Sequence, residues 1–239
     1  MRPQSITIIV PAFNEQRNIS SAIDSIINAL EGFPGDFEMI VFNDGSQDQT
    51  GEIAEGRAKG HPQIKIVHND INRGYGYCYQ KGLELSVMEY VGVFPGDNDM
   101  AWESLRDLVR NIGEADIIAS YMSDMRRRSV LRRILSRLFT CLMNVIFHMK
   151  LRYFNGSFIC RRKLLRSIPI KAKSLVVIAE CLVRLIKSGA SYQEICFTHS
   201  GRKSERSKAL YPKSIVAVLH DVFVLWTDIY LSKSQRNNS

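Results

Sequence analysis

Residues 6–15 read ITIIVPAFNE, in which a run of β-branched residues ends at Pro11 and a helical pattern follows. The same succession returns downstream, where short apolar runs alternate with segments that repeat apolar residues at helical spacing. Strands alternating with helices predict a parallel sheet covered by helices on both faces. Ligands bind beyond the carboxyl ends of such strands, which here means residues 11–15, 43–48 and 95–99.

The chain has 239 residues, enough for one sizeable core. Strands are predicted over residues 6–10, 37–42, 64–67, 90–94, 117–121 and 158–160. Helices are predicted over residues 18–30, 50–59, 75–87, 130–149, 179–187 and 214–231. We therefore expect an α/β fold with a mostly parallel sheet and amphipathic helices in the C-terminal half. The predicted division is one domain over residues 1–210, followed by an apolar helix and polar tail over 211–239.

Two carboxylates, Asp97 and Asp99, follow the apolar run 91–94 and the break at Pro95-Gly96. Carboxylates one residue apart at a strand end can both bind a hard cation, and oxygen ligands suit Mg²⁺ or Mn²⁺. For this segment alone a solvated turn is the alternative, since Asp and Asn are common in turns. Its position in line with two other acidic strand ends favours the metal site.

The other two strand ends also carry acidic residues. Asp44 and Asp48 can accept hydrogen bonds from a ribose or a base, and Gly45 lets the backbone turn tightly. The alternative for Asp48 is to cap the following helix. Glu15 is expected at the start of a helix, where the dipole favours a carboxylate, and Phe13 either stacks on a base or packs in the core.

In this order, PAFNE (11–15), NDGSQDQT (43–50) and GDNDM (96–100) resemble the family-2 glycosyltransferases, which have the GT-A (Rossmann-like) fold. Asn72-Arg73-Gly74 is similar to a further region of that family. The second half resembles the polyprenyl-phosphate sugar transferases of the dolichyl-phosphate mannose synthase type. The corresponding parts are the basic segment 126–137, the turn Phe154-Asn155-Gly156, Glu180 and the stretch 202–208.

The resemblance implies an inverting, metal-dependent transfer from a UDP- or GDP-linked sugar. Asp97 and Asp99 would hold the metal. The implied substrate-binding residues are Pro11, Phe13, Glu15, Asp44, Gly45, Ser46, Asp48, Arg73, Gly74, Asn155, Gly156 and Glu180. The implied catalytic residues are Asp97, Asp99, Arg126, Arg128, Arg202 and Lys208.

The acceptor depends on what activates the nucleophile. A sugar hydroxyl needs a general base, which many family members supply with a Glu-Asp pair on a late helix, whereas Glu180 here is followed by Cys181. A lipid phosphate is already an anion and needs cations instead. The arginines of segments 126–137 and 202–208 favour this acceptor, although a solvated basic face is the alternative. We therefore expect polyprenyl phosphate, with a soluble family-2 enzyme acting on a glycan or glycolipid hydroxyl as the alternative.

A membrane surface fits the two long helical patterns. Residues 130–149 place apolar residues on one side and arginines on the other, as interfacial helices do. Residues 214–231 are too short and too interrupted for a comfortable span, and their polar positions fall seven apart on one narrow stripe. This second helix is expected on a bilayer or in a homo-oligomer interface. Packing of both helices on the protein's own core is the alternative.

Charge and cysteine content restrict the partners and the compartment. The net charge of +8 favours an anionic partner. Nucleic acid is not expected, because the chain has no helix-turn-helix, zinc spacing or aromatic-basic strand pattern. The 5 cysteines are scattered, which predicts neither a zinc site nor a disulfide framework. The expected location is cytoplasmic, peripheral on the inner face of the cytoplasmic membrane. A binding-only transferase is a further alternative, since Asn43 and Ala101 depart from the family pattern.

Overall fold

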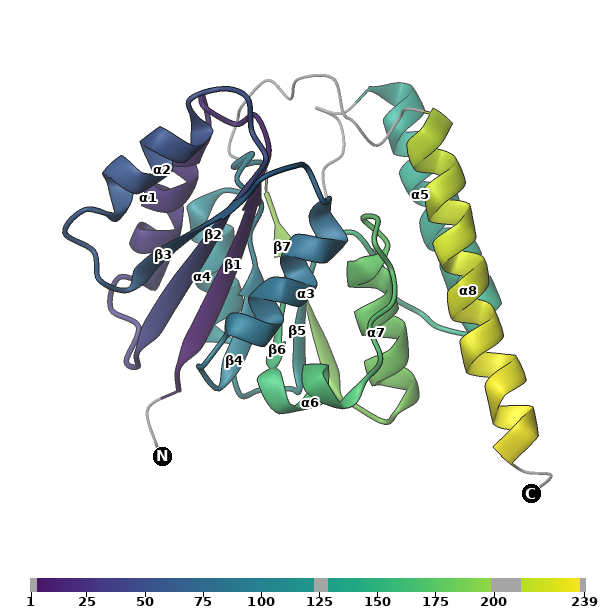
Figure 1. The fold of residues 1–239 in the computed structure, drawn as a ribbon. Helices are drawn as coiled ribbons and strands as arrows, with labels where there is room; N and C mark the ends of the chain where they lie inside the picture. Colours follow the sequence, from purple (N-terminus) through teal and green to yellow (C-terminus); the bar gives the residue numbers. More distant parts are fainter. Residues whose placement is uncertain (1–3, 123–128, 199–211, 237–239) are drawn as a thin grey trace.

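A computed structural model describes residues 4–122, 129–198 and 212–236, and Figure 1 shows their arrangement around one sheet. The sheet has seven strands in the order β3-β2-β1-β4-β6-β5-β7. Among them, only β6 runs antiparallel to its neighbours. The strands are β1 (Ile6–Ala12), β2 (Phe37–Asp44), β3 (Ile64–Asn69), β4 (Tyr90–Val93), β5 (Ile117–Met122), β6 (Phe158–Arg161) and β7 (Tyr192–Phe197).

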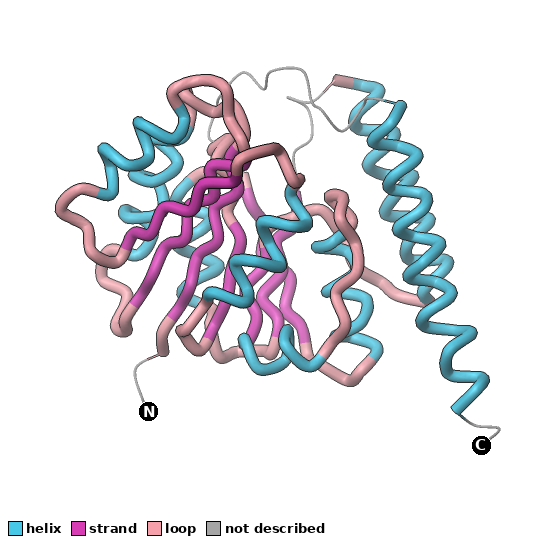
Figure 2. Tube along the Cα trace, viewed as in Figure 1, coloured by secondary structure: helices cyan, strands magenta, loops and turns pink. Residues whose placement is uncertain are grey.

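Helices cover both faces of this sheet (Figure 2). The helices are α1 (Ile19–Leu30), α2 (Thr50–Ala58), α3 (Tyr75–Leu85), α4 (Trp102–Arg110), α5 (Val130–Phe147), α6 (Arg162–Ser167), α7 (Val177–Lys187) and α8 (Pro212–Arg236). Residues of α1, α2 and α4 form one buried apolar cluster with the sheet. Residues of α3, α5, α6, α7 and α8 belong to a second cluster on the other face. The predicted mixed α/β fold is thus confirmed.

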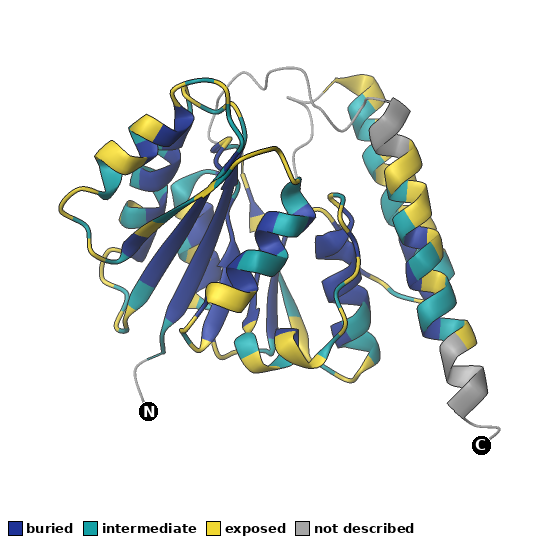
Figure 3. Ribbon diagram, viewed as in Figure 1, coloured by how far each residue is buried: buried dark blue, intermediate teal, exposed yellow. Residues whose placement is uncertain are grey.

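The central strand β1 is formed by the first apolar run of the sequence. All seven of its residues are buried, as expected for a strand covered on both faces (Figure 3). On one face α3 approaches closely, because Gly82 has no side chain. A Cβ there would come within 2.8 Å of three side-chain carbons of Ile9. Burial of β1 and close packing of α3 therefore support each other.

Three elements lie where no element was predicted: β7, α4 and α6. β7 is an edge strand whose residues are mostly half-exposed, so it lacks the apolar run that marks the buried strands. The predicted helix over 130–149 ends earlier, at Phe147. His148 takes a left-handed conformation with φ of 50°, which terminates the helix.

Helices α5 and α8 lie side by side at the margin of the molecule (Figure 1). The Tyr230 hydroxyl of α8 donates to the carbonyl of Ile146 in α5 at 3.1 Å, and the Tyr230 ring stacks on Phe147. Met143 and Phe147 of α5 are buried, as are Val222, Leu225 and Ile229 of α8. Both helices therefore pack partly on the core, and this contact accounts for only one side of each.

The opposite sides of α5 and α8 are apolar and exposed (Figure 3). We call the following residues the outer apolar side: Val130, Leu131, Ile134, Leu135, Leu138, Leu142 and Val145 of α5, with Val216, Leu219, Phe223, Trp226 and Leu231 of α8. Leu138 is 60% exposed and Phe223 is 62% exposed. Core packing, the alternative considered for both helices, does not account for these residues. Across the described part of the chain, we find no helix with both the length and the apolar character that a membrane crossing requires.

Candidate functional site

The carboxyl ends of β1, β2 and β4 meet at one edge of the sheet, because these strands are parallel. The loops that follow β1 and β2 are hydrogen-bonded to each other there. The Asn14 amide donates to Oγ of Ser46 at 3.0 Å, and the Gln47 amide donates to Oδ1 of Asn14 at 2.9 Å. Asn14 takes a left-handed conformation with φ of 56°, which Asn tolerates well. Ser46 thus holds the two loops together.

Asp48 lies one position before Gln49, the N-cap residue of α2, and its carboxylate bonds the first amide of that helix, close to the predicted capping role. Its Oδ1 accepts from the Thr50 amide at 3.0 Å, and its Oδ2 accepts from the Gln16 amide at 3.2 Å. Burial opposes ionisation of Asp48, but these hydrogen bonds and that of the Thr50 hydroxyl outweigh it and lower the pKa. Thr50 also accepts from the Glu15 amide at 2.7 Å. Glu15 lies in the loop before α1, which begins at Ile19 rather than at Glu15.

Asp44 is buried and holds the loop that leads into α3. Its Oδ1 accepts from the Arg73 amide at 2.9 Å, and its Oδ2 accepts from the Gly74 amide at 2.8 Å. Asn69 donates to the same carboxylate at 2.8 Å. Gly45 must lack a side chain here, because its φ is +68° and a Cβ would lie 2.4 Å from the Ile71 carbonyl carbon. Asp44 therefore positions Arg73 and Gly74, while its predicted contact with a nucleoside stays a prediction.

The acidic turn after β4 is seated against the end of β1. The Gly96 amide donates to the Pro11 carbonyl at 3.0 Å, and a Cβ at Gly96 would lie 2.9 Å from that of Ala12. Asp97 is exposed and Asp99 is half-exposed. Burial raises the pKa of Tyr75, and the carboxylate of Asp97 raises it further. The first residue of α3 therefore lies close to the acidic turn.

The donor set of this turn suits a hard divalent cation. Asp97 and Asp99 supply two carboxylates from a single turn, in which Oδ1 of Asp97 also accepts from the Asp99 amide at 3.2 Å. Within the described residues, no three His, Cys, Asp or Glu side chains come together as a complete metal cage. A cation held by these two carboxylates would complete its shell with water and phosphate, which is how Mg²⁺ usually binds beside nucleotides.

Among the predicted residues of the second half, Gly156 is buried and Asn155 is exposed. A Cβ at Gly156 would come within 2.2 Å of the Ser120 carbonyl oxygen, so the glycine lets this turn cross β5 closely. The predicted cations Arg126, Arg128, Arg202 and Lys208 lie outside the described residues. Their roles therefore stay predictions.

Glu180 is a buried anchor rather than an open carboxylate. Its Oε2 accepts from the amides of Lys171 at 2.9 Å and Ala172 at 2.7 Å. Its Oε1 pairs with Arg184 at 2.8 Å, and Glu180 is only 2% exposed. Arg184 in turn pairs with Asp228 of α8 at 2.7 Å. These bonds occupy both carboxylate oxygens in structural contacts, and the predicted substrate contact of Glu180 is untested.

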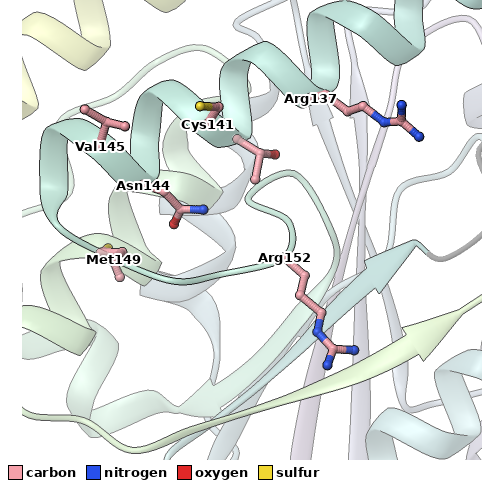
Figure 4. Close-up of a pocket in the computed structure, with 7 residues that line it drawn as sticks. Arg137, Cys141, Asn144, Val145, Met149 and Arg152 are labelled. Atoms are coloured by element: carbon pink, nitrogen blue, oxygen red, sulfur yellow. The ribbon is translucent and has the colours of Figure 1, made fainter.

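A pocket of about 460 Å³ lies along α5, and Figure 4 shows its lining residues Arg137, Thr140, Cys141, Asn144, Val145, Met149 and Arg152. In this view the two arginines lie toward one end and Val145 with Met149 toward the other. The Asn144 side chain ties α5 to the loop that follows it, since it donates to the Leu151 carbonyl at 2.8 Å and accepts from the Leu151 amide at 3.0 Å. The pocket is thus cationic at one end and apolar at the other.

Arg152 is held toward the sheet edge that carries the acidic turns. Its guanidinium lies 4.6 Å from the ring centre of Tyr121, near the carboxyl end of β5. β5 runs in the same direction as β4, because both are antiparallel to β6. The arginine end of the pocket and the acidic turns therefore lie at the same edge.

Several residues of this edge were missed from the sequence, namely Asn69, Tyr75, Arg137 and Arg152. Asn69 ends β3 and Tyr75 starts α3, so their places beside two predicted segments were the available signal. Arg152 sits in a loop, where no periodicity marks its partner. Arg137 was assigned to the polar side of a helix, without indication of the pocket beneath it.

Comparison with known proteins identifies relatives of this chain. A model of the family described as Glycosyl transferase family 2 matches residues 7–177. Dolichyl-phosphate beta-glucosyltransferase ALG5C of Trichomonas vaginalis is 32% identical over 111 residues, which cover 44% of this chain and 33% of that protein. The aligned part of the chain thus spans about a third of that relative's length.

The fold matches solved structures over nearly the whole chain. Glucosyl-3-phosphoglycerate synthase of Mycobacterium tuberculosis bound to UDP superposes with a TM-score of 0.68, at 20% identity, over 94% of this chain and 79% of that one. Its complex with Mn²⁺, UDP-glucose and phosphoglyceric acid gives a TM-score of 0.66, at 20% identity, over 91% and 79%. At this identity the likeness establishes the fold that both proteins share.

Proposed function

Because this chain belongs to Glycosyl transferase family 2, we propose that it moves a sugar from a nucleoside-diphosphate sugar to a polyprenyl phosphate at the cytoplasmic face of a membrane. The observation that carries the acceptor class is the outer apolar side of α5 and α8, which stays exposed although both helices also pack on the core. The lipid-phosphate acceptor of the Trichomonas vaginalis relative, as its name states, supports the same class.

The donor binds at the edge formed by the loops after β1, β2 and β4. The structural neighbours are bound to UDP or to UDP-glucose, which supports a nucleotide-sugar donor. Asp48 and Ser46 stabilise the first two loops, and Asp44 fixes the Arg73-Gly74 backbone beside them. Preorganised loops lower the entropic cost of binding a flexible nucleotide. UDP-linked and GDP-linked sugars are both donors to be tested.

Asp97 and Asp99 would hold Mg²⁺ or Mn²⁺, which when bound neutralises negative charge on the departing diphosphate. In the proposed reaction the anomeric carbon–oxygen bond to the diphosphate breaks, and a bond to an acceptor phosphate oxygen forms on the opposite side. The phosphate is already an anion and gives up no proton. This chemistry fits Glu180, whose carboxylate is occupied by Lys171, Ala172 and Arg184 and does not serve as a base.

The pocket beneath α5 fits the polar end of such an acceptor. Arg137 and Arg152 provide cations at one end, and Val145 and Met149 provide an apolar wall at the other. An amphiphile with an anionic head has the same two-part character. Val145 belongs both to the pocket wall and to the outer apolar side, so a lipid held here can continue along α5.

Vesicle binding tests the membrane part of the proposal. We expect the protein to sediment with vesicles of phosphatidylcholine and phosphatidylglycerol. Leu131→Ser with Leu138→Ser should weaken this binding about tenfold or more, since each side chain loses transfer free energy. The matched control replaces Leu85 and Val87, which are also exposed but lie near the end of α3. If the α5 double variant binds vesicles as well as the Leu85 and Val87 control does, α5 has no membrane role. If substitutions in the apolar side of α8 abolish self-association instead, that side is a homo-oligomer interface.

Product extraction tests the acceptor. The protein is incubated with Mn²⁺, a short-chain polyprenyl phosphate and a panel of labelled UDP- and GDP-sugars, and label is counted in the organic phase. Label that requires the lipid phosphate and disappears with Asp99→Ala supports the proposal. Donor binding without organic-phase label would direct the assignment to a family-2 transferase acting on a hydroxyl of a glycan or glycolipid.

A further inference from the structure

Residues 171–174, which we call the strap, lie in the connection from α6 to α7, have no regular secondary structure and contact three helices. In Figure 1 the chain from α6 to α7 runs between α3 and α7. A segment of this kind has no ladder of its own, so its backbone groups need partners elsewhere. Those partners come from α3, α7 and α8.

Toward α3, the strap carbonyls accept hydrogen bonds from the first two turns of the helix. The Gly76 amide donates to the Lys173 carbonyl at 3.2 Å, and the Gln80 side chain donates to the Ala172 carbonyl at 3.0 Å. Gly76 has no room for a side chain, because a Cβ would lie 2.6 Å from the Ala172 carbonyl oxygen. The strap thus lies directly on the helix start that follows Arg73 and Gly74.

Toward α8, the strap is held by two carboxylates on the narrow polar stripe. Asp221 accepts from the Ser174 hydroxyl at 2.7 Å and from the Ser174 amide at 3.2 Å. Asp228 pairs with the Lys171 ammonium at 2.8 Å and also with Arg184. The seven-residue spacing of Asp221 and Asp228 thus brings one carboxylate to each end of the strap.

We propose that Asp221 and Asp228 position the donor loop through the strap, so that the seating of α8 controls how firmly Arg73 and Gly74 are held for the nucleotide. This inference rests on the proposed donor site. The sequence of contacts is continuous: α8 carboxylates hold Lys171 and Ser174, the strap carbonyls hold α3, and Asp44 holds the loop immediately before α3. Both aspartates act as positioning residues and do not touch the donor.

The seating of α8 also depends on its surroundings. The opposite side of this helix carries exposed apolar residues, among them Val216 and Phe223. A membrane or protein surface that contacts this apolar side would contact the same helix that holds the strap. Under the proposed membrane binding, the donor site is linked through α8 to the membrane surface, a coupling of two sites through packed elements and hydrogen bonds.

Hydrogen exchange tests the positioning role without any ligand. In Asp221→Ala, and in the double variant with Asp228→Ala, we expect the peptide over residues 70–80 to exchange about three- to tenfold faster. Thr227→Ala is the matched control, because among the described residues its hydroxyl bonds within α8, to the Val224 carbonyl. Faster exchange confined to 171–176 and α8, with 70–80 unchanged, would overturn the proposal. If the double variant does not fold, the single Asp221→Ala variant decides.

Nucleotide binding gives the second readout. The dissociation constants of UDP and of GDP, each with Mn²⁺, should rise about three- to tenfold in the Asp221 variant and stay unchanged in Thr227→Ala. Unchanged nucleotide affinity beside faster exchange at 70–80 would overturn the link to the donor. If the unsubstituted protein binds neither nucleotide, the proposed donor fails, and the exchange experiment still decides whether the aspartates position the loop.

Discussion

Replacing Glu180 by Gln should destabilise the protein strongly, although the change keeps the shape of the side chain. The carboxylate is 2% exposed and accepts from two backbone amides as well as from Arg184. An amide group must turn its own N–H donors toward one of these donor sets. Breaking a buried ion pair costs about 3–5 kcal/mol, and Arg184 retains Asp228, so we expect the lower end, about 3 kcal/mol.

Urea denaturation followed by far-UV circular dichroism measures this loss, and for a chain of this size about 3 kcal/mol lowers the midpoint of thermal unfolding by about 6–12 °C. The matched control is Glu89→Gln, which breaks a pair with Arg161 whose side chains are 45% and 46% exposed. Exposed pairs contribute about 0–1 kcal/mol. A Glu180→Gln variant no less stable than Glu89→Gln would refute the anchoring role derived from burial and hydrogen bonding.

Three further changes test the loops of the donor edge. Gly45→Ala should lower the free energy of unfolding by about 2–3 kcal/mol in urea denaturation, because φ is +68° and the new Cβ meets the backbone of residues 71–72. In the control Gly56→Ala, in α2, the new Cβ meets nothing, and the free energy of unfolding should rise by about 0.5–1 kcal/mol. Asp48 has a lowered pKa in the folded chain, so its contribution is present above the unfolded pKa and lost as the pH falls through the folded one. The stability advantage of the unsubstituted protein over Asp48→Asn is therefore expected to be full at pH 7 and to shrink below about pH 4, and a constant difference would contradict it. Asp99→Asn should abolish the Mn²⁺-dependent part of UDP or GDP binding in calorimetry, and an undiminished Mn²⁺ effect would refute the metal assignment.

The pattern of strand ends was readable from the sequence because it is local. An apolar run followed at once by Pro, Gly, Asn or Asp indicates the end of a parallel strand. Three such strand ends in order predicted both the sheet and the edge at which ligands bind. That Asp48 bonds the start of α2 was predictable for the same reason, since its partner Thr50 lies two residues away. β7 escaped prediction because an edge strand is half-exposed and shows no buried run.

Contacts between distant segments were decided only by the folded chain. Asp44 and Glu180 were predicted as substrate contacts, which stay predictions, and the folded chain adds that their oxygens hold the backbone at 73–74 and 171–172. Nothing in the spacing of residues announces a hydrogen bond across 29 positions of sequence.

The α/β fold, the family and the sheet edge that carries the acidic turns could be predicted from local patterns in the sequence. So could the apolar side of α5, the apolar side of α8 and the polar stripe of α8. That the stripe binds the strap, and that much of each apolar side faces outward, is known only from the folded chain. Helical periodicity predicts which side chains share a side of a helix, whereas the neighbour that meets that side is set by packing against the rest of the chain.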